Sequence, residues 1–308
     1  KGESCPNRWF TAVTNKNGNR VRYMKYTIKL TAMASAVSVL ATAAMAAEVR
    51  IYNWSDYIDE SILEDFTKET GIEVTYDVFD SNEILETKLL AGGTGYDIVV
   101  PTGSFLSRQI EAGVFQKLDK SKLPNLKNMW AEIAAQTAKY DPGNEYSINY
   151  MWGTTGIGYN VGKLKEITGQ DEITSWATIF DPAQIAKFKD CGIHVLDAPD
   201  ELIPAALNYL GLDPNTSNPD DLAKAEEALM AIRPYIQKFH SSEYINALAN
   251  GDICLAVGWS GDVLQARDRA AEADNGVEVG AVVGHVGLEQ CGLERHQPHD
   301  PASVFLEQ

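Results

Sequence analysis

The residue types best suited to binding chemistry stand together at Trp54, Ser55, Asp56 and Tyr57. They follow an apolar strand start at Ile51, so they place a carboxylate, a hydroxyl and two aromatic rings at the carboxyl end of a strand. Open α/β sheets bind ligands at that end. Aromatic faces beside a carboxylate favour an organic cation. The Ser-Asp pair equally suits the cap of a helix, and both interpretations of Asp56 stay open at this point.

An alternation of strands and helices must position these residues. We expect strands over 49–53, 72–79 and 97–100, and helices over 59–70 and 84–90. The first helix carries Ile62, Leu63 and Phe66 on one face and stops at Gly71. This β-α-β-α-β order predicts a parallel sheet with helices on both faces.

Two finer features belong to the same region. Asp80 and Glu83 stand three residues apart before the second helix, which is typical of a capping box. The glycine-rich run 92–95 breaks the chain before the strand at 97–100, which we expect to be short and buried. The region 47–149 is thus expected to form a first lobe.

A second α/β domain is expected over 150–273, inserted into the first. We expect helices near 163–168, 182–189, 201–211, 219–232 and 243–249, and strands over 148–152, 156–160, 193–196 and 253–258. Val277, Val279 and Val282 then suggest a crossing strand over 274–283 that returns to the first lobe.

The amino-terminal part is typical of an export signal. Lys25 and Lys29 form a basic region, an alanine-rich apolar stretch follows, and 44–46 (AMA) fits the small-residue cleavage rule. We therefore expect a signal peptide over 24–46 and a start at Met24. Residues 1–23 have no apolar period, so we interpret them as a non-native upstream extension; a genuine extension is the alternative.

The carboxyl-terminal residues 284–308 show neither a helical nor a strand period. They contain His285, His296 and His299, whose spacing does not suit one helix face, so a metal site is disfavoured. We expect an aberrant, disordered tail that does not belong to either lobe.

Charge and motifs exclude several classes of function. A net charge of −17 leaves no basic patch for nucleic acid or anionic lipid. Gly156 and Gly158 do not form a dinucleotide fingerprint, because the third glycine falls at 162 instead of 161. No cofactor or metal is expected. His194 and His240, the only histidines in the patterned region, fit no catalytic arrangement, so we do not expect an enzyme.

Cysteine usage fits an oxidising compartment. Of Cys5, Cys191, Cys254 and Cys291, only the middle two lie in well-patterned sequence, and they form the natural disulfide pair after export. Two free, buried cysteines are the alternative.

Several stretches together resemble one family, the polyamine-binding proteins of bacterial ABC importers, most closely the putrescine-binding type. The matching stretches are 51–58 (IYNWSDYI), 78–82 (VFDSN), 95–101 (GYDIVVP), 150–160 (YMWGTTGIGYN), 196–199 (LDAP), 207–211 (LNYLG) and 250–262 (NGDICLAVGWSGD). They stand in the order that the family has them. The resemblance implies an α/β, type II periplasmic binding protein fold, with two lobes built on parallel-type sheets and joined by a hinge.

The resemblance also implies the site. Trp54, Ser55, Asp56 and Tyr57 would line the first-lobe wall, with Thr102 and Ser104 in the loop after the third strand; Glu201 and Asp262 would face an ammonium group from the second lobe, and Trp259 would flank the methylene chain. The family usually has serine where Thr102 stands. From the residues alone, Trp259 to Asp262 equally suit a strand end and turn.

The function that the resemblance implies is capture of a polyamine, putrescine first, in the periplasm, and its delivery to the membrane subunits of an ABC importer by a monomeric protein. A polyamine sensor that presents its ligand to a membrane receptor is the alternative, and a polyamine-modifying enzyme is disfavoured. Family members continue with a Trp-Phe-Asp segment and a later Tyr that this sequence does not contain. We therefore expect an incomplete first-lobe wall, and either weak polyamine binding or a chain that is only marginally folded.

Overall fold

The computed structural model describes residues 47–282. The described residues after Ala47 belong to one compact unit that begins at Glu48. The expected upstream extension, signal peptide and tail lie outside the described residues. Among the described residues, no helix has the length and apolar character needed to cross a membrane.

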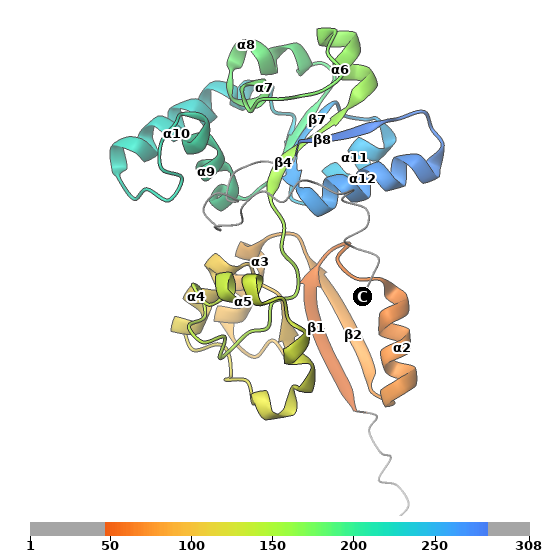
Figure 1. The fold of residues 1–308 in the computed structure, drawn as a ribbon, viewed down its shortest axis with the longest axis vertical. Coiled ribbons are helices and arrows are strands. Elements are labelled where there is room, and N and C mark those ends of the chain that lie inside the picture. The colour runs from red at the N-terminus through yellow and green to blue at the C-terminus, as the bar shows by residue number, and fades with distance from the viewer. Residues whose placement is uncertain (1–46, 283–308) are drawn as a thin grey trace, which may run out of the picture. The chain divides into compact units, whose positions relative to one another are not determined.

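Lobe 1 is built on a parallel three-stranded sheet in the order β2-β1-β3. The strands are β1 (Glu48–Trp54), β2 (Glu73–Phe79) and β3 (Ile98–Val99). The helices are α2 (Glu60–Thr70), α3 (Asn82–Ala91), α4 (Gly103–Glu111) and α5 (Ala131–Thr137), with 3-10 turns at Lys120–Lys122 and Pro124–Asn128. Figure 1 shows β1 and β2 side by side, with α2 next to β2. The predicted β-α-β-α-β order and the parallel sheet are confirmed, while α4 and α5 were not expected.

The helix ends of lobe 1 are set by local sequence. Asp59 caps the first turn of α2, and Gly71 ends that helix in the left-handed region with φ 71°. α3 begins at Asn82, earlier than predicted, so its capping position falls on Ser81. The capping-box prediction for Asp80 and Glu83 is therefore wrong, and the Asp80 carboxylate is available for other contacts.

Lobe 2 is built on a mixed five-stranded sheet in the order β6-β5-β7-β4-β8. The strands are β4 (Thr155–Asn160), β5 (Ile193–Val195), β6 (Lys238–Phe239), β7 (Leu255–Trp259) and β8 (Val279–Val282). The helices are α6 (Val161–Thr168), α7 (Ala177–Phe180), α8 (Pro182–Ile185), α9 (Pro199–Tyr209), α10 (Pro219–Ile232), α11 (Tyr244–Asn250) and α12 (Ser260–Ala273), with 3-10 turns at Ala186–Phe188 and Arg233–Tyr235.

Three sequence predictions for this region need correction. β4 runs antiparallel to both β7 and β8, so the second sheet is not purely parallel. Residues 148–154 form no strand; they connect the lobes as an irregular segment. The predicted crossing strand is present as β8, but it pairs with β4 inside the lobe 2 sheet. A return to lobe 1 would concern residues after 282, which are not described.

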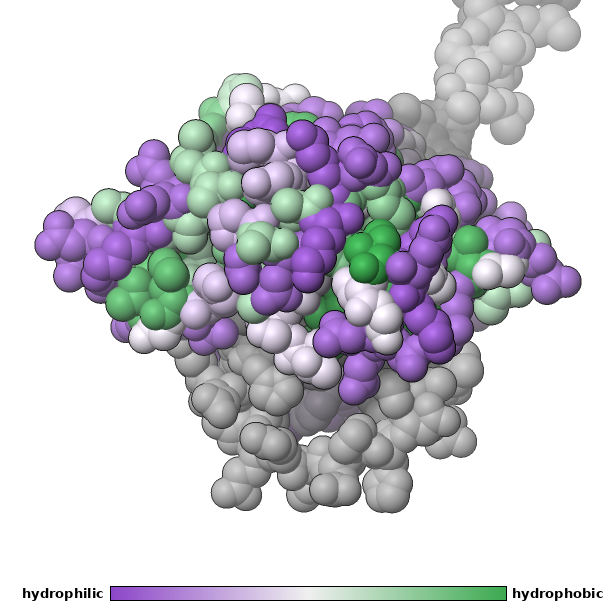
Figure 2. All heavy atoms as spheres, turned by 90° about the horizontal axis from the view of Figure 1, so that it is seen from above, coloured by the Kyte–Doolittle hydropathy of each residue, from purple (hydrophilic) through white to green (hydrophobic). Residues whose placement is uncertain are grey.

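The two lobes differ in how much apolar surface the described residues bury. Lobe 2 contains two extensive clusters of buried side chains, whereas the cluster of lobe 1 consists of Tyr52, Phe79 and Leu85. Large exposed apolar side chains are more numerous in lobe 1 than in lobe 2, and they include Ile62 (57% exposed) and Phe66 (39%) on α2. The predicted apolar face of α2 is thus not covered by described residues. The lobe 2 face in Figure 2 is mostly hydrophilic, with small separate apolar patches.

Cys191 and Cys254 form the predicted disulfide. Their Cα atoms lie 5.5 Å apart, and 63 positions separate them in the chain. Cys254 precedes the central strand β7 and is buried. The bond therefore ties the turn before β5 to the middle of the lobe 2 sheet.

Candidate ligand-binding site

Two tryptophans meet where side chains of lobe 1 contact side chains of lobe 2. At the end of β1, the Trp54 indole N–H donates to the Val100 carbonyl oxygen (2.8 Å), which fixes the ring beside β3. At the end of β7, the Trp259 ring lies edge-on to Trp54, with centroids 5.1 Å apart. Both rings thus stand at the carboxyl ends of strands.

Asp262 is the most deeply buried acidic group near these rings. It lies in the first turn of α12 and is 1% exposed. The Tyr57 hydroxyl donates to one carboxylate oxygen (2.6 Å), and the Tyr244 hydroxyl donates to the other. Burial raises the pKa of Asp262 to about 6, although the two hydrogen bonds favour the charged form. A cation placed beside it would therefore be strongly stabilised.

Glu201 is a second carboxylate whose ionised form is costly. It lies in the first turn of α9 and is partly buried, and this burial raises the pKa of its carboxyl group. Hydrogen bonds from the Thr155 hydroxyl and from the Trp259 side chain counteract the rise. Trp259 therefore contacts one carboxylate directly and, as described below, supports the other.

Asp56 is paired with a basic residue of lobe 2. Its backbone has a left-handed φ of 63°, which is uncommon for a residue other than glycine. The Arg269 guanidinium lies 2.6 Å from the Asp56 carboxylate, and the Gln265 side-chain amide donates to the Asp56 carbonyl oxygen (3.0 Å). Helix α2 is capped by Asp59, so Asp56 does not serve as its cap.

Ser55 contributes to a separate contact between the lobes. Its hydroxyl lies 3.5 Å from a carboxylate oxygen of Asp80, which follows β2. The Ser242 hydroxyl of lobe 2 donates to the same oxygen (2.8 Å). Asp80, rather than Ser55, is therefore the closer partner of lobe 2 here.

Thr102 and Ser104 stand at the start of α4, as expected from the loop after β3. Their hydroxyl oxygens lie 3.3 Å apart, and Ser104 donates to the Asp200 carboxylate (3.3 Å). Asp200 directly precedes Glu201 in α9. These hydroxyls thus lie close to the helix start that carries Glu201.

Sequence reasoning missed several residues of this region, notably Thr155, Tyr244 and Arg269. Thr155 opens β4 inside a stretch that carries the family resemblance, so its position was a usable signal. Tyr244 lies in α11, a helix that the sequence predicts near 243–249, but the pattern does not show which residues its side chain meets. Arg269 lies in α12, a helix that was not expected. Among the described residues, no group of three or more His, Cys, Asp and Glu side chains is arranged to hold a metal ion.

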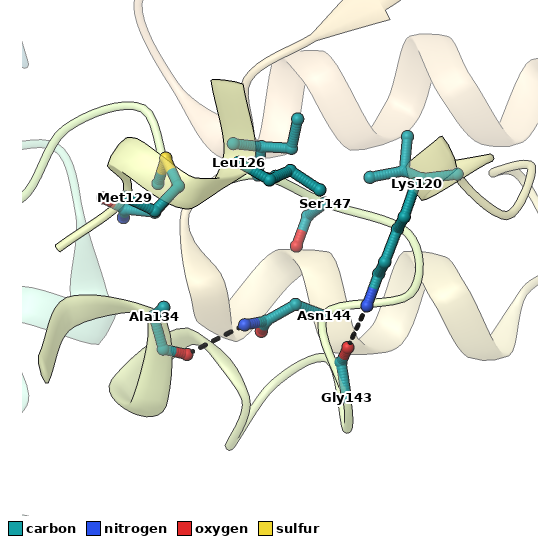
Figure 3. A pocket seen from close by; sticks show the side chains of 10 residues that line it. Lys120, Leu126, Met129, Ala134, Gly143, Asn144 and Ser147 are labelled. Atoms are coloured by element: carbon teal, nitrogen blue, oxygen red, sulfur yellow. Dashed lines mark hydrogen bonds between the residues drawn. The ribbon is translucent and has the colours of Figure 1, made fainter. Parts of the chain in front are cut away.

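A separate cavity of about 190 Å³ lies in lobe 1 (Figure 3). Its lining includes Leu126, Met129, Asn144 and Lys120, whose ammonium group donates to the Gly143 carbonyl oxygen. No carboxylate lines it. Because it offers one cation and no anion, this cavity does not suit a positively charged ligand, and none of the predicted site residues lines it.

Comparison with known proteins places the chain in a family. Residues 61–297 match the family model described as "Bacterial extracellular solute-binding protein". The putrescine-binding periplasmic protein SpuD of Pseudomonas aeruginosa is 55% identical over 259 residues, which cover 84% of this chain and 70% of that protein. The putrescine-binding periplasmic protein PotF of Escherichia coli is 56% identical over 246 residues, which cover 79% of this chain and 66% of that protein.

Solved structures support the same assignment. A putative spermidine/putrescine ABC transporter protein from Listeria monocytogenes has a TM-score of 0.63 at 34% identity and covers 77% of this chain and 68% of that chain. The Tp0655 (TpPotD) lipoprotein of Treponema pallidum has a TM-score of 0.64 at 30% identity, with 77% and 70% covered. These likenesses confirm the predicted two-lobed α/β fold. The match to a family of solute-binding proteins confirms the prediction that the chain is not an enzyme. The chain belongs to the bacterial extracellular solute-binding proteins.

Proposed function

We propose that this chain captures putrescine between its two lobes in the periplasm and delivers it to the membrane subunits of an ABC importer. The names of the two relatives that are more than half identical to it, both putrescine-binding periplasmic proteins, support this ligand. We further propose that it acts as a monomer and binds no nucleic acid, in keeping with its net charge of −17.

The observation that carries the proposal is the pair of lobe 2 carboxylates, Glu201 and Asp262, which are linked to Trp259 by its side chain and, through Tyr244, by its backbone N–H. Burial raises the pKa of both carboxyl groups, so their charged forms are costly without a positive partner. A diamine supplies a cation at each end of an apolar chain. Carboxylates hold its ends through charge-assisted hydrogen bonds, and an aromatic face suits its methylene groups.

Ligand entry requires the lobes to separate. The Trp54 and Trp259 rings contact each other directly, and the Tyr57 hydroxyl reaches Asp262 from the other lobe. A ligand that inserts between the rings must part these contacts. Once its cations neutralise the carboxylates, the contacts between the lobes can form around it, so binding favours closure.

Isothermal titration calorimetry with the purified chain tests the proposal. Putrescine is expected to bind one-to-one, and butylamine, which has a single ammonium group, much more weakly. E201Q and D262N should each lose on the order of 30-fold in affinity or more, because each removes a buried charge partner. E226Q and D268N, which alter exposed carboxylates on α10 and α12, should bind as the unmodified chain does. Titration with spermidine ranks the two polyamines.

Absence of saturable binding of any polyamine would contradict the proposed function. Equal affinities of D262N and D268N for putrescine would show that Asp262 does not bind the ligand. A pull-down with membrane subunits of an importer, compared with receptor subunits, separates import from sensing, since only the matching partner should be retained when putrescine is present.

A further inference from the structure

The Asp262 carboxylate is held by two tyrosine hydroxyls that come from different lobes. Tyr57 of lobe 1 donates to one oxygen, and Tyr244 of lobe 2 donates to the other. Separation of the lobes removes the first hydrogen bond but leaves the second, since α11 and α12 pack together within lobe 2. Tyr244 is therefore the partner that Asp262 keeps throughout a binding cycle.

The hydrogen of the Tyr244 hydroxyl has a fixed direction. The backbone N–H of Trp259 donates to the Tyr244 oxygen (3.0 Å), which occupies the oxygen as an acceptor. The single hydroxyl proton is then free to point at the Asp262 carboxylate. Because Tyr244 is 0% exposed, no water competes for that proton. The hydroxyl therefore donates a hydrogen bond that is stronger to the charged carboxylate than to the protonated carboxyl group.

Gly258 provides the space that this arrangement needs. A Cβ atom at position 258 would lie 2.3 Å from a Tyr244 ring carbon and 2.7 Å from its hydroxyl oxygen. The ring therefore lies directly against the backbone of β7, one residue before Trp259. Any larger residue at 258 would push the hydroxyl away from both of its partners.

The same network reaches the second carboxylate. The Trp259 backbone supports Tyr244, and the Trp259 side chain hydrogen-bonds to Glu201. Movement of this residue would alter the surroundings of both carboxylates together. The half of the site in lobe 2 is thus organised around one strand end.

We propose, on the basis of the proposed function, that Tyr244 is a positioning residue that keeps Asp262 oriented and ionised for the ligand ammonium group, and that Gly258 is required for it. Tyr244 need not touch the ligand. The other titratable or charged groups that face Asp262 are Tyr57, Asp56 and Arg269.

The substitution Y244F tests this role, because it removes the hydroxyl and keeps the ring. Y159F is the matched control. Tyr159 is also buried in lobe 2, and its ring lies against Gly280 as the Tyr244 ring lies against Gly258. Its hydroxyl forms a hydrogen bond with the backbone at Ile173. Two readouts are compared, putrescine affinity by calorimetry and the Asp262 carboxyl titration by carbon-13 NMR, assigned with D262N.

Y244F is expected to weaken putrescine binding about tenfold at pH 7.5 relative to Y159F, since a hydrogen bond to a charged group is worth that much. It should also shift the Asp262 titration midpoint to higher pH. G258A, compared with G280A, should change both readouts in the same direction while retaining the hydroxyl. Equal midpoints and equal affinities in Y244F and Y159F would overturn the proposal.

The NMR titration needs no ligand, so it separates this proposal from the proposed function. If the unmodified chain binds no polyamine, the function fails, yet a raised Asp262 midpoint in Y244F still supports the positioning role. If the chain binds putrescine and the midpoint does not move, the positioning role fails alone. If Y244F melts far below Y159F, the proposal is tested instead by the Asp262 titration midpoint in G258A compared with that in G280A.

Discussion

The Asp56 carboxylate and the Arg269 guanidinium lie 2.6 Å apart, although 213 positions separate them in the chain. This pair joins the loop after β1 in lobe 1 to helix α12 in lobe 2. Arg269 also donates to the Asn246 side chain (2.8 Å), which orients the guanidinium from a second helix. The protein itself thus supplies a positive partner for the Asp56 carboxylate, and we propose that Asp56 contributes to binding through contact between the lobes.

Replacement of Arg269 should therefore weaken putrescine binding, although Arg269 is not among the residues predicted to contact the ligand. R269Q is expected to lower the affinity about three- to tenfold, because both partners are partly exposed and solvent screens such pairs. The loss should shrink at high salt. R267Q is the matched control, as Arg267 pairs with Asp268 on the exposed side of the same helix. Equal calorimetric affinities for the two variants would contradict a role of the pair in closure.

The affinity for putrescine should fall as the pH falls through about 6, the pKa to which burial raises Asp262. Protons compete with the ligand ammonium for that carboxylate below its pKa. Burial also raises the pKa of Glu201, so protonation of Glu201 adds to the loss of affinity. Calorimetry from pH 8 to pH 5 in two buffers of different ionisation enthalpy should detect proton release on binding near pH 6. A flat affinity over this range would contradict the proposed protonation states.

The raised pKa of Asp262 also makes a prediction for stability without ligand. A carboxyl group with a usual value of 3.8 and a folded value of about 6 binds more protons in the folded state between these limits. Its contribution is favourable below the unfolded value and is lost as the pH rises through about 6. D262N should then stabilise the ligand-free chain at pH 7.5, by on the order of 3 kcal/mol at most, and should have little effect near pH 4.

Thermal unfolding at the two pH values measures this difference. D268N, on the same helix but exposed, is expected to change the melting temperature little at either pH. A D262N variant that melts lower than the unmodified chain at pH 7.5 would mean that the two tyrosine hydrogen bonds outweigh the cost of burial.

The elements of lobe 1 were predictable where one local signal dominates. The strands β1 and β2 alternate, and α2 is bounded by Asp59 and Gly71, so their order follows from sequence. Helices α4 and α5 were missed because they are short, with nine and seven residues. The segment at 148–154 has strand-forming residues, but no neighbouring strand among the described residues pairs with it, and it serves as a connection.

The site was predictable in its lobe walls but not in its supporting contacts. Trp54 and Trp259 end strands, and Asp262 follows one, in stretches that resemble the family, which is why sequence reasoning selected them as candidates. Contacts such as those of Arg269 and Tyr244 join side chains of different elements, and a local pattern does not show which residues of another element a helical side chain meets. The pairing of Asp56 with Arg269 illustrates this limit.

Loss of the Cys191–Cys254 bond should destabilise lobe 2. A cross-link across 63 positions restricts the unfolded chain, and the loop-entropy model assigns about 4 kcal/mol to a loop of this length. The double variant C191S/C254S is expected to melt lower than the oxidised chain and about as low as the chain treated with reductant. Mass spectrometry of unreduced peptides checks that the bond is present. Equal melting with and without reductant, in a chain shown to be oxidised, would contradict this prediction.

Lobe 1 is expected to open more readily than lobe 2. Its described core contains few buried side chains, and α2 has none, with Ile62 and Phe66 exposed. Local opening requires little free energy where few apolar contacts are broken. Amide hydrogen exchange should therefore be faster in α2 than in α10, a surface helix of lobe 2 that buries Ala225 and Ile232.

Mass spectrometry after brief exposure to deuterated buffer measures both helices in the same sample, so α10 is an internal control. Putrescine should slow exchange at the end of β1, where Trp54 and Tyr57 meet lobe 2, and should leave α10 unchanged. Slow exchange in α2 without ligand would contradict the prediction. It would mean that residues outside the described range cover the apolar face of that helix, because the described residues do not cover it.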